Sequence, residues 1–570
     1  MNNWEIAQIF NEIADLLDIL GESPYKSRAY RRAAHKLSTT YLDAVQLSQE
    51  GRLQEIPGIG DALAKKIQEL VTTGKLRYYD ELREKVPASL RQLLLIPGIG
   101  AKTAQIIYQH LRPKDLAELE TAAREKRLRE LPGIGSKTEE AILRGLEALA
   151  SSKKRLLLHH AFTVAGEIRD YLKSLSGITM TSSAGSLRRG TETVGDLDFV
   201  AVAHDPLTVI KELATAPFLQ ELLTADNSQL SLMTKWGIRA DILVVQPEYY
   251  ATALQYITGS KEHNEELCVL ARSLGWESSE KGLSPGQEGQ LPSSEEELYS
   301  RLGMLYIPPE LREGRGEIQA ARKGILPYLL ELCDLKGDLH VHSHWSDGVN
   351  SLEELAVEAR RRGYQYLAVT DHSKSLHVAR GLTEDRIWEQ REEIRRLNQR
   401  FTDFRLLAGI EVEIRPDGSL DFDDDLLAEM DIVVASIHSG FNQDEKTLTE
   451  RVISAMENKH VDIIGHPTGR LLGRREPYSI DIEQVLKVAA ATGTALEINS
   501  SPDRLDLCDR YIRRGKELGV CFAVNTDAHD LHYLDDLQYG VLQARRGWLE
   551  RDDVINTMSF EQLSDWLQRA

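Results

Sequence analysis

The chain has 570 residues, a formal net charge of −20 and 42% hydrophobic residues, so it is too long for one hydrophobic core and predicts three to five domains. Its four cysteines are scattered, which excludes a disulfide framework and a thiolate metal site. No apolar run is long enough to cross a bilayer, and the first residues lack the pattern of a signal peptide, so we expect a cytoplasmic protein without a membrane partner.

The negative charge is spread unevenly along the chain. Residues 1–150 carry a net charge of +1, whereas residues 331–570 carry −16 and ten of the sixteen histidines. A near-neutral first part with basic clusters can still contact phosphates locally, although a strongly acidic chain by itself argues against nucleic acid. The acidic, histidine-rich last part offers carboxylates and imidazoles as metal ligands.

Three similar segments lie near the amino end: LQEIPGIGDALAKKIQEL, LLLIPGIGAKTAQIIYQHL and LRELPGIGSKTEEAILRGL. Each predicts a helix, a tight glycine turn and a second amphipathic helix. The glycines permit a left-handed backbone and leave amides uncovered at a helix N-terminus, which is an anion site; they are Gly58, Gly60, Gly98, Gly100, Gly133 and Gly135.

This repeated pattern resembles the helix-hairpin-helix motif, which binds the DNA backbone without reading its sequence. One copy would be explained as well by an ordinary turn between packed helices. Three copies favour DNA binding over that alternative.

Lys66 follows the first of these turns on its second helix. From the residues alone, it is a solvated or phosphate-contacting lysine.

Residues 184–202, AGSLRRGTETVGDLDFVAV, place Asp196 and Asp198 one residue apart in an apolar run that predicts a β-strand. Residues i and i+2 share one face of a strand, so these carboxylates repel each other unless a cation lies between them. Asp241 opens a second apolar run, RADILVV, and is a plausible third partner. Three carboxylates on adjacent strands suit Mg²⁺ or Mn²⁺, and two such ions support phosphoryl transfer.

A glycine-serine turn and two arginines precede these aspartates, and would supply donors to phosphate oxygens. A lone Asp-x-Asp is better explained by a turn and a solvated strand residue. The full string G-S-x-R-R-G-x(5)-D-x-D, however, resembles the family X nucleotidyltransferases, the DNA polymerase beta-like repair enzymes. The resemblance extends to YITGSKEHN and to LGESPYKSRAYRRAAHKL near the start.

That resemblance implies a role for each matching position. The three aspartates would be catalytic metal ligands. Lys66 would stand where some relatives use a lysine to form a Schiff base with an abasic sugar, and Ala62 replaces a nearby residue that is often lysine. The nucleotide would be bound by Gly185, Ser186, Arg189 and Gly195 on the triphosphate side, by Tyr256 and Gly259 at the sugar, and by Asn264 at the base edge. The sequence departs from the family at Ile257, and at Glu265, Glu266 and Cys268, where similar bacterial sequences have basic residues and where carboxylates would repel DNA phosphates.

The string GDLHVHSHWSDG places His340 and His342 on one face of a predicted strand, with Asp347 in the next turn. Two imidazoles at i and i+2 can share one metal ion. Candidate ligands recur after later β-branched runs, at His372, Glu411, His438, His466, Asp527 and His529. We expect them to converge at one mouth of a β/α barrel. Imidazole and carboxylate ligands without cysteine favour Mn²⁺ or Zn²⁺.

These residues resemble the polymerase and histidinol phosphatase (PHP) family, a distorted β/α barrel with up to three metal ions. The resemblance implies three ligand sets: His340, His342, Glu411 and Asp527; Glu411, His438 and His466; and Asp347, His372 and His529. His340, His342 and Glu411 would be catalytic. The implied reaction is hydrolysis of a phosphodiester or a phosphomonoester.

Together the two resemblances predict a multidomain α+β and α/β protein. The expected order is a helical DNA-end-binding domain with a hairpin motif (1–85), fingers with two such motifs (86–150), a nucleotidyltransferase palm (151–250), a thumb (251–318), a linker (319–336) and a PHP barrel (337–570). The expected function is DNA repair, by gap-filling polymerisation and 3′–5′ exonuclease action, with cutting at abasic sites as a further activity.

The expected partners are deoxynucleoside triphosphates and gapped or nicked double-stranded DNA with a 3′ end. We expect a monomer that associates with the nucleoid. Three alternatives stay open: a nuclease whose polymerase half serves mainly as a DNA clamp, a DNA-end scaffold with both sites silent, and a small-molecule phosphatase whose hairpins only pack helices.

Overall fold

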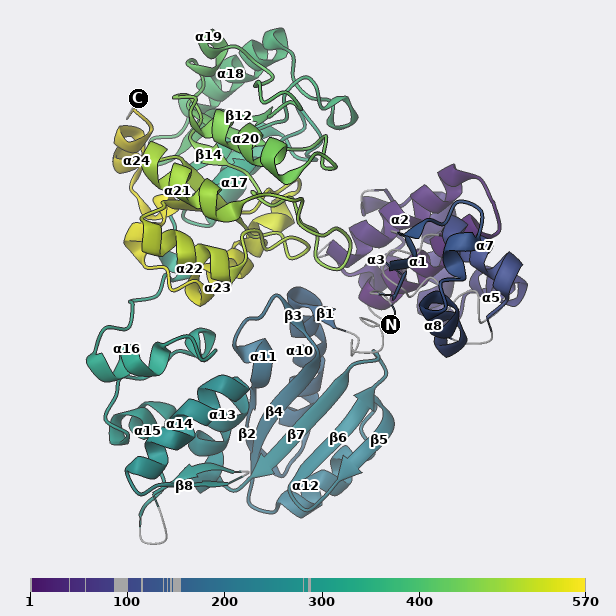
Figure 1. Cartoon of the computed structure of the whole chain (residues 1–570), viewed down its shortest axis with the longest axis vertical. Coiled ribbons are helices and arrows are strands. Elements are labelled where there is room, and N and C mark those ends of the chain that lie inside the picture. The colour runs from purple at the N-terminus through teal and green to yellow at the C-terminus, as the bar shows by residue number, and fades with distance from the viewer. Residues whose placement is uncertain are drawn as a thin grey trace. The chain divides into compact units, whose positions relative to one another are not determined.

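The computed structural model describes residues 3–568 except 40–41, 57, 87–100, 114–115, 137, 141, 144–145, 147–154, 280 and 286–288. The chain divides into two compact units, Met1–Arg155 and Leu156–Ala570 (Figure 1). Among the described residues, no helix is both long enough and apolar enough to cross a membrane.

The described elements of the first unit are helices. They are α1 (Asn3–Ile19), α2 (Pro24–Thr39), α3 (Ala44–Glu50), α4 (Asp61–Thr73), α5 (Arg77–Lys85), α7 (Ala101–Leu111), α8 (Leu116–Arg124) and the 3₁₀ turns η1 (Leu53–Glu55) and η2 (Leu128–Glu130). One apolar cluster runs through this unit and joins Leu37 on α2 to Ile107 on α7. The described helices before and after residue 86 therefore share a core, and the predicted boundary there stays a prediction.

The second unit begins with a five-stranded sheet, and residues 156–249 are called the sheet domain below. Its strands lie in the order β2 (Ile178–Ser183), β4 (Asp196–Ala203), β7 (Arg239–Val245), β6 (Gln229–Thr234) and β5 (Leu219–Ala225). Only β4 and β7 pair in parallel; the other neighbours are antiparallel. Helices α10 (Leu158–Ser174) and α12 (Pro206–Leu213) pack against it, and β4 is buried from Phe199 onward.

Residues 250–324 form the helical domain. Its elements are α13 (Tyr250–Thr258), α14 (Lys261–Ser273), α15 (Glu295–Arg301), α16 (Glu317–Lys323) and a hairpin of β8 (Glu277–Ser279) and β9 (Gly282–Ser284). Its apolar cluster includes Leu267, Trp276 and Tyr299, and also Trp548 from the last part of the chain. The core of this domain is thus completed by a side chain more than two hundred residues away.

Residues 337–568 form the barrel domain, in which seven strands pair in parallel and in sequence order. They are β10 (Gly337–Val341), β11 (Tyr366–Val369), β12 (Arg405–Glu413), β13 (Ile432–Ser436), β14 (Ile463–Ile464), β15 (Ala495–Asn499) and β16 (Phe522–Asn525). The first and last strands approach each other, because the His342 amide donates to the Ala528 carbonyl at 2.8 Å. The sheet therefore nearly closes, and the predicted mixed fold with a distorted barrel is confirmed.

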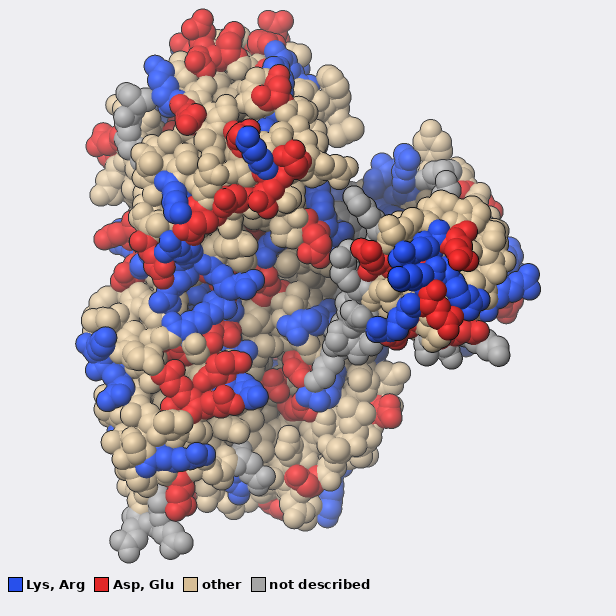
Figure 2. Space-filling model, in the orientation of Figure 1, with Lys and Arg blue, Asp and Glu red and all other residues tan. Residues whose placement is uncertain are grey.

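Helices connect the barrel strands on the outside (Figure 1). They are α17 (Leu352–Arg361), α18 (Glu384–Asn398), α19 (Asp424–Leu427), α20 (Glu445–Met456), α21 (Ile482–Thr492) and α22 (Asp509–Leu518); two more helices, α23 (Leu537–Arg546) and α24 (Phe560–Leu567), follow the last strand. On the face drawn in Figure 2, Asp and Glu side chains are frequent on the barrel domain, and Lys and Arg side chains gather where α22 approaches α16. The acidic charge of the last part of the chain is therefore interrupted at this junction.

Candidate active sites

The aspartate site consists of Asp196, Asp198 and Asp241. Asp196 and Asp198 open β4, and the parallel register of β4 and β7 places Asp198 beside Asp241 and Asp196 beside Arg239. The three predicted carboxylates therefore lie on adjacent strands at the same end of the sheet. This is a hard oxygen donor set of the kind that Mg²⁺ or Mn²⁺ prefers.

Arg239 neutralises part of the charge of this site. Its Nη2 atom lies 2.8 Å from Oδ2 of Asp196 and 2.8 Å from Oδ2 of Asp241. Asp198 is left more strongly perturbed: burial, and then repulsion from Asp196 and Asp241, raises its pKa to about 7. The sequence-based interpretation did not include Arg239, although its place two residues before Asp241 puts it on the same face of the strand.

The turn before β4 approaches the aspartate site closely. Gly185 has φ +58°, and a Cβ built on it would lie 1.8 Å from Oδ2 of Asp198. Only glycine both adopts this positive φ readily and lacks a Cβ that would clash with Asp198. The Oγ of Ser186 is buried and has no hydrogen-bond partner among the described residues, so this hydroxyl is available to a ligand. Gly195 is buried between β3 (Thr193–Val194) and Asp196.

The two arginines of the turn contact the helical domain. Arg188 pairs with Glu295 at 2.6 Å and donates to the Thr258 hydroxyl at 2.8 Å. Arg189 lies 3.0 Å from Oε1 of Glu313 and donates to the Thr258 carbonyl at 2.8 Å. Both guanidinium groups therefore hold α13 and α15 against the turn, and phosphate binding by Arg189 stays a prediction.

The predicted sugar- and base-contacting residues lie around the turn between α13, which contains Tyr256, and α14, which contains Asn264. The Asn264 amide donates to the Tyr256 carbonyl at 2.7 Å and to the Gly259 carbonyl at 3.3 Å. A Cβ on Gly259 would meet Oδ1 of Asn264 at 2.4 Å. The structure thus brings the three residues together, and the hydrogen bonds of the Asn264 side chain stabilise this turn.

The atypical residues after this turn face different surroundings. Glu265 is exposed and lies 3.7 Å from Lys261. Glu266 accepts a hydrogen bond from Gln319 on α16, and Cys268 packs against the apolar cluster of the helical domain. Only Glu265 of the three is fully available to repel a DNA phosphate.

Two of the four described hairpin glycines have the left-handed backbone that the sequence predicts, whereas Gly60 is extended with φ −85°. Gly58 and Gly133 adopt φ +85° and +77°, and Gly60 caps α4. Gly135 has open space around its Cβ position. Gly98 and Gly100 lie outside the described residues. Lys66, on α4, places its Nζ 5.0 Å from the centre of the Tyr78 ring, a cation–π contact.

The histidine site gathers all nine predicted ligands of the barrel domain. Three groups of donor atoms lie close enough to hold an ion: His342, Asp347, His372 and His529; His340, His342 and Asp527; and His372, Glu411 and His438. Glu411 is central, with Oε1 3.2 Å from Nε2 of His466 and 3.5 Å from that of His340. Buried donors that make no hydrogen bond, such as His340 Nε2, His342 Nε2 and Glu411 Oε2, fit metal ligation.

Two details differ from the expectation. Glu411 lies inside β12 and does not follow a strand as expected, whereas His340 lies inside β10, in agreement with its place on a predicted strand. His342 and His372 each belong to two groups, whereas each was assigned to one ion. The rings of His342 and His372 are stacked with their centres 4.3 Å apart. The three groups of donor atoms therefore share residues.

Buried carboxylates govern the protonation of the histidine site. Burial opposes the charged imidazole, yet Glu411 and Glu413 raise the pKa of His438 to about 10, and Asp347 and Asp527 raise that of His529 to about 9. Burial and the neighbouring imidazoles lower the pKa of His342 to about 3. The carboxylates of Glu411 and Asp527 have pKa values well below the usual range, because the surrounding histidines outweigh their burial.

The sequence-based interpretation missed the residues that orient these ligands. Glu497 accepts from Nδ1 of His340 at 2.7 Å, and Glu413 contacts Nδ1 of His438 at 2.9 Å. Each bond leaves Nε2 directed toward the site. A signal existed in the sequence: Glu497 is an acid inside the apolar strand LEIN, and Glu413 lies two residues after Glu411.

Comparisons with known proteins cover the whole chain. Family models match residues 1–76 (Helix-hairpin-helix domain), 90–148 (SAM-like Helix-hairpin-helix tandem), 253–313 (DNA polymerase beta thumb) and 338–501 (PHP domain). The chain is 40% identical over 573 residues to DNA polymerase/3'-5' exonuclease PolX of Bacillus subtilis (strain 168), covering 100% of both chains.

Two further relatives match separate parts. A probable phosphatase of Thermoanaerobacter sp. (strain X514) is 31% identical over 231 residues, which are 39% of this chain and 89% of that one. DNA polymerase lambda of Rattus norvegicus is 25% identical over 343 residues, which are 55% of this chain and 56% of that one.

Proposed function

The chain belongs to the family of DNA polymerase/3'-5' exonuclease PolX, and from this premise we propose that it is a DNA repair enzyme that extends 3′ ends at the aspartate site and trims them at the histidine site. Both resemblances inferred from the motifs are confirmed by this membership. The observation that carries the proposal is that one chain holds two separate donor sets: three carboxylates on β4 and β7, and nine predicted ligands in the barrel domain, of which eight form groups that could hold an ion and His466 contacts Glu411.

At the aspartate site, Asp196, Asp198 and Asp241 would hold Mg²⁺ or Mn²⁺, which would activate a 3′ hydroxyl and stabilise the leaving pyrophosphate. The turn that begins at Gly185 would receive the triphosphate, because the free Ser186 hydroxyl can donate to a phosphate oxygen. Arg189 would add its guanidinium, and Tyr256, Gly259 and Asn264 would bind the sugar and base.

At the histidine site, the nine ligands would hold Mn²⁺ or Zn²⁺, up to three ions, which would supply Lewis-acid charge for attack on a phosphodiester. The chain's own part is orientation. Glu497 and Glu413 hold Nδ1 of His340 and His438, and thereby fix the ring nitrogen that each presents to the site. Burial of His340, His342 and Glu411 keeps bulk water away from these charges.

The substrates that fit this pair of sites are gapped or nicked double-stranded DNA and deoxynucleoside triphosphates. The described hairpin turns, with Gly58 and Gly133 in the left-handed region, support binding of the DNA backbone. Schiff-base chemistry at Lys66 and cutting at abasic sites are further proposals, tested by borohydride trapping on an abasic duplex and by incision of that duplex.

Gapped, end-labelled DNA tests the proposal. With Mn²⁺ and nucleotides the wild type should extend the primer, and with Mn²⁺ alone it should shorten it. Extension without shortening would remove the exonuclease from the proposal. Shortening without extension would favour the nuclease with a DNA clamp. Filter binding to gapped DNA should weaken with salt; no binding at any salt would favour a small-molecule phosphatase.

A further inference from the structure

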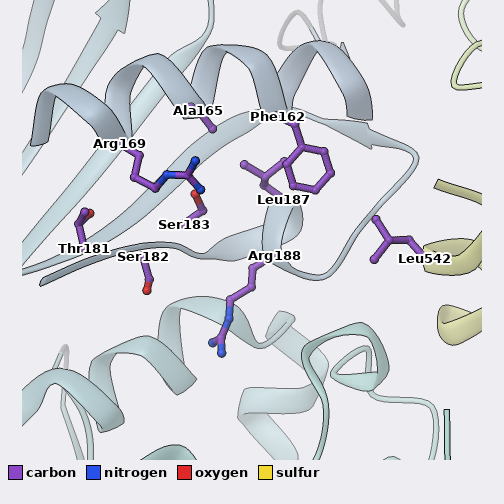
Figure 3. A pocket seen from close by; sticks show the side chains of 10 residues that line it. Phe162, Ala165, Arg169, Thr181, Ser182, Ser183, Leu187, Arg188 and Leu542 are labelled. Carbon is purple, nitrogen blue, oxygen red and sulfur yellow. The ribbon is translucent and has the colours of Figure 1, made fainter. Parts of the chain in front are cut away.

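The turn between Gly185 and Glu192, which is proposed to bind the triphosphate, packs against the barrel domain. Leu542 of α23 lies 3.3 Å from the position that a Cβ on Gly190 would take. The same leucine lines a cavity of about 300 Å³ together with Phe162, Leu187 and Arg188. Figure 3 shows Leu542 entering from a separate ribbon to face Leu187 and Phe162. Helix α23 therefore packs directly against the turn.

Arg546, at the end of α23, connects three parts of the second unit. Its Nη1 donates to the Arg189 carbonyl at 2.9 Å and lies 2.7 Å from Oε1 of Glu313. Its Nη2 lies 2.7 Å from Oδ2 of Asp509. The Arg546 side chain is only 6% exposed, so these contacts are formed away from bulk water.

A second contact fixes the other end of the turn. Glu192 pairs with Arg470 at 2.7 Å and accepts from the Gln543 amide at 2.7 Å. Arg470 lies four residues after His466, a predicted ligand of the histidine site. The turn between Gly185 and Glu192 is thus held by the barrel domain at both Arg189 and Glu192.

The charges around Glu313 give Arg546 a specific effect on Arg189. Both guanidinium groups contact the same oxygen, Oε1 of Glu313, at 2.7 Å and 3.0 Å. Burial favours the neutral form, but Arg546 and Arg189 lower the pKa of Glu313 overall, so one carboxylate charge is shared between two cations. Each cation is therefore held less tightly than it would be by an undivided partner.

We propose that Arg546 is a positioning residue for nucleotide addition: by sharing Glu313 with Arg189, it weakens the hold of Glu313 on the Arg189 guanidinium and so lets this group turn from Glu313 and the Thr258 carbonyl to the triphosphate. This inference rests on the proposed function of the aspartate site. It makes the barrel domain a structural part of the polymerase site, independent of the chemistry at its own metal ligands.

The test is steady-state nucleotide addition by the full-length protein on gapped DNA with Mn²⁺. In Arg546→Gln, Glu313 has Arg189 as its main remaining cation and holds it more tightly, so KM for the nucleotide should rise about tenfold with a smaller change in kcat. Glu313→Gln should lower KM. The double variant Glu313→Gln/Arg546→Gln should have the KM of Glu313→Gln alone to within about twofold, because without the Glu313 carboxylate Arg546 has nothing to share with Arg189.

Arg545→Gln is the matched control, because Arg545 is the preceding residue of α23 and pairs with Glu310 at 2.8 Å without contacting Arg189. Its KM should equal that of the wild type. An unchanged KM in Arg546→Gln, an equal rise in Arg545→Gln, or a double variant worse than either single variant would overturn the inference.

Thermal melting and circular dichroism establish whether each variant is folded. If Arg546→Gln does not fold, Glu313→Gln decides alone: a lowered KM supports the inference, and an unchanged or raised KM overturns it. If the wild type adds no nucleotide at all, the proposed function fails and the inference fails with it. If the wild type adds nucleotide and the variants have the same KM as the wild type, the inference fails and the proposed function stands.

Discussion

The aspartate site and the histidine site balance their negative charge in different ways. At the aspartate site, the guanidinium of Arg239 lies 2.8 Å from two of the three carboxylates. At the histidine site, the carboxylates of Glu411 and Asp527 lie among imidazoles whose charge depends on pH. The first site is neutralised by a permanent cation, and the second by groups that can release protons.

This difference has a consequence for metal binding. A guanidinium cannot lose its proton in the working range of a protein, so an ion entering the aspartate site has to displace Arg239 or share carboxylates with it. An ion entering the histidine site displaces protons instead. We therefore expect the histidine site to bind metal on its own, and the aspartate site to bind it well only with the nucleotide's phosphates present.

The largest expected effect comes from removing the carboxylate that the histidine site shares. In Glu411→Gln, five histidines lose a common charged partner, and exonuclease activity should fall by about a thousandfold or more. Primer extension should stay within about twofold of the wild type, because the aspartate site is unchanged.

Glu413→Gln is the matched change, two residues along β12, and removes a carboxylate that contacts His438 Nδ1 and accepts from the His438 amide and the Ser439 hydroxyl. It should cost about 10- to 100-fold in metal affinity or activity. Equal losses in the two variants would show that Glu411 has no special role as a shared ligand.

A smaller effect is expected on the polymerase side from Gly185→Ala. The added Cβ would lie 1.8 Å from Oδ2 of Asp198, so this carboxylate must move, and extension should fall by about a hundredfold. Exonuclease activity measured on the same preparation should be retained.

Gly303→Ala controls for backbone strain, since Gly303 has φ +75° with nothing within 4 Å of its Cβ position. It should lower the melting temperature slightly and leave extension intact. A Gly185→Ala enzyme that extends as fast as Gly303→Ala would refute the close contact with Asp198.

The smallest expected effect is a difference in pH dependence. Carboxylates raise the pKa of His438 to about 10 and that of His529 to about 9 against the effect of burial, so chelated protein holds protons there at pH 7.5. Raising the pH removes these competitors. In Asp198→Ala, which keeps the histidine site, Mn²⁺ affinity should therefore rise by more than about tenfold per pH unit.

Calorimetry of Mn²⁺ binding in buffers of different ionisation enthalpy measures this proton release directly. At the aspartate site, at most the proton of Asp198, whose pKa is about 7, should be released. A Mn²⁺ affinity of Asp198→Ala that does not change with pH would contradict the proposed charge balance.

The grouping of the candidate ligands at each site was predictable from strand geometry. Alternation along a strand places Asp196 and Asp198 on one face, and the succession of strands brings His340 and Asp527 to one barrel mouth. The mixed fold followed from the same periodicities.

The residues that tune the sites were harder to predict, because their roles arise only from tertiary contacts. Arg239 meets two aspartates through strand register, and Arg546 reaches Glu313 across 233 positions of the sequence. A buried acid in an apolar strand, such as Glu497, is a sequence signal for such a role, since a buried charge requires a partner. An arginine near the end of a predicted helix, such as Arg546, is usually exposed, so its sequence position does not indicate a buried contact.

The most direct test of two independent metal sites is one gapped-primer assay with Mn²⁺ on the wild type, Asp198→Ala and His342→Ala. We predict that Asp198→Ala loses extension and keeps 3′–5′ degradation, and that His342→Ala keeps extension and loses degradation. Loss of both activities in either variant, or loss of neither in both, would contradict the assignment of separate chemistry to the carboxylates of β4 and β7 and to the histidines of the barrel.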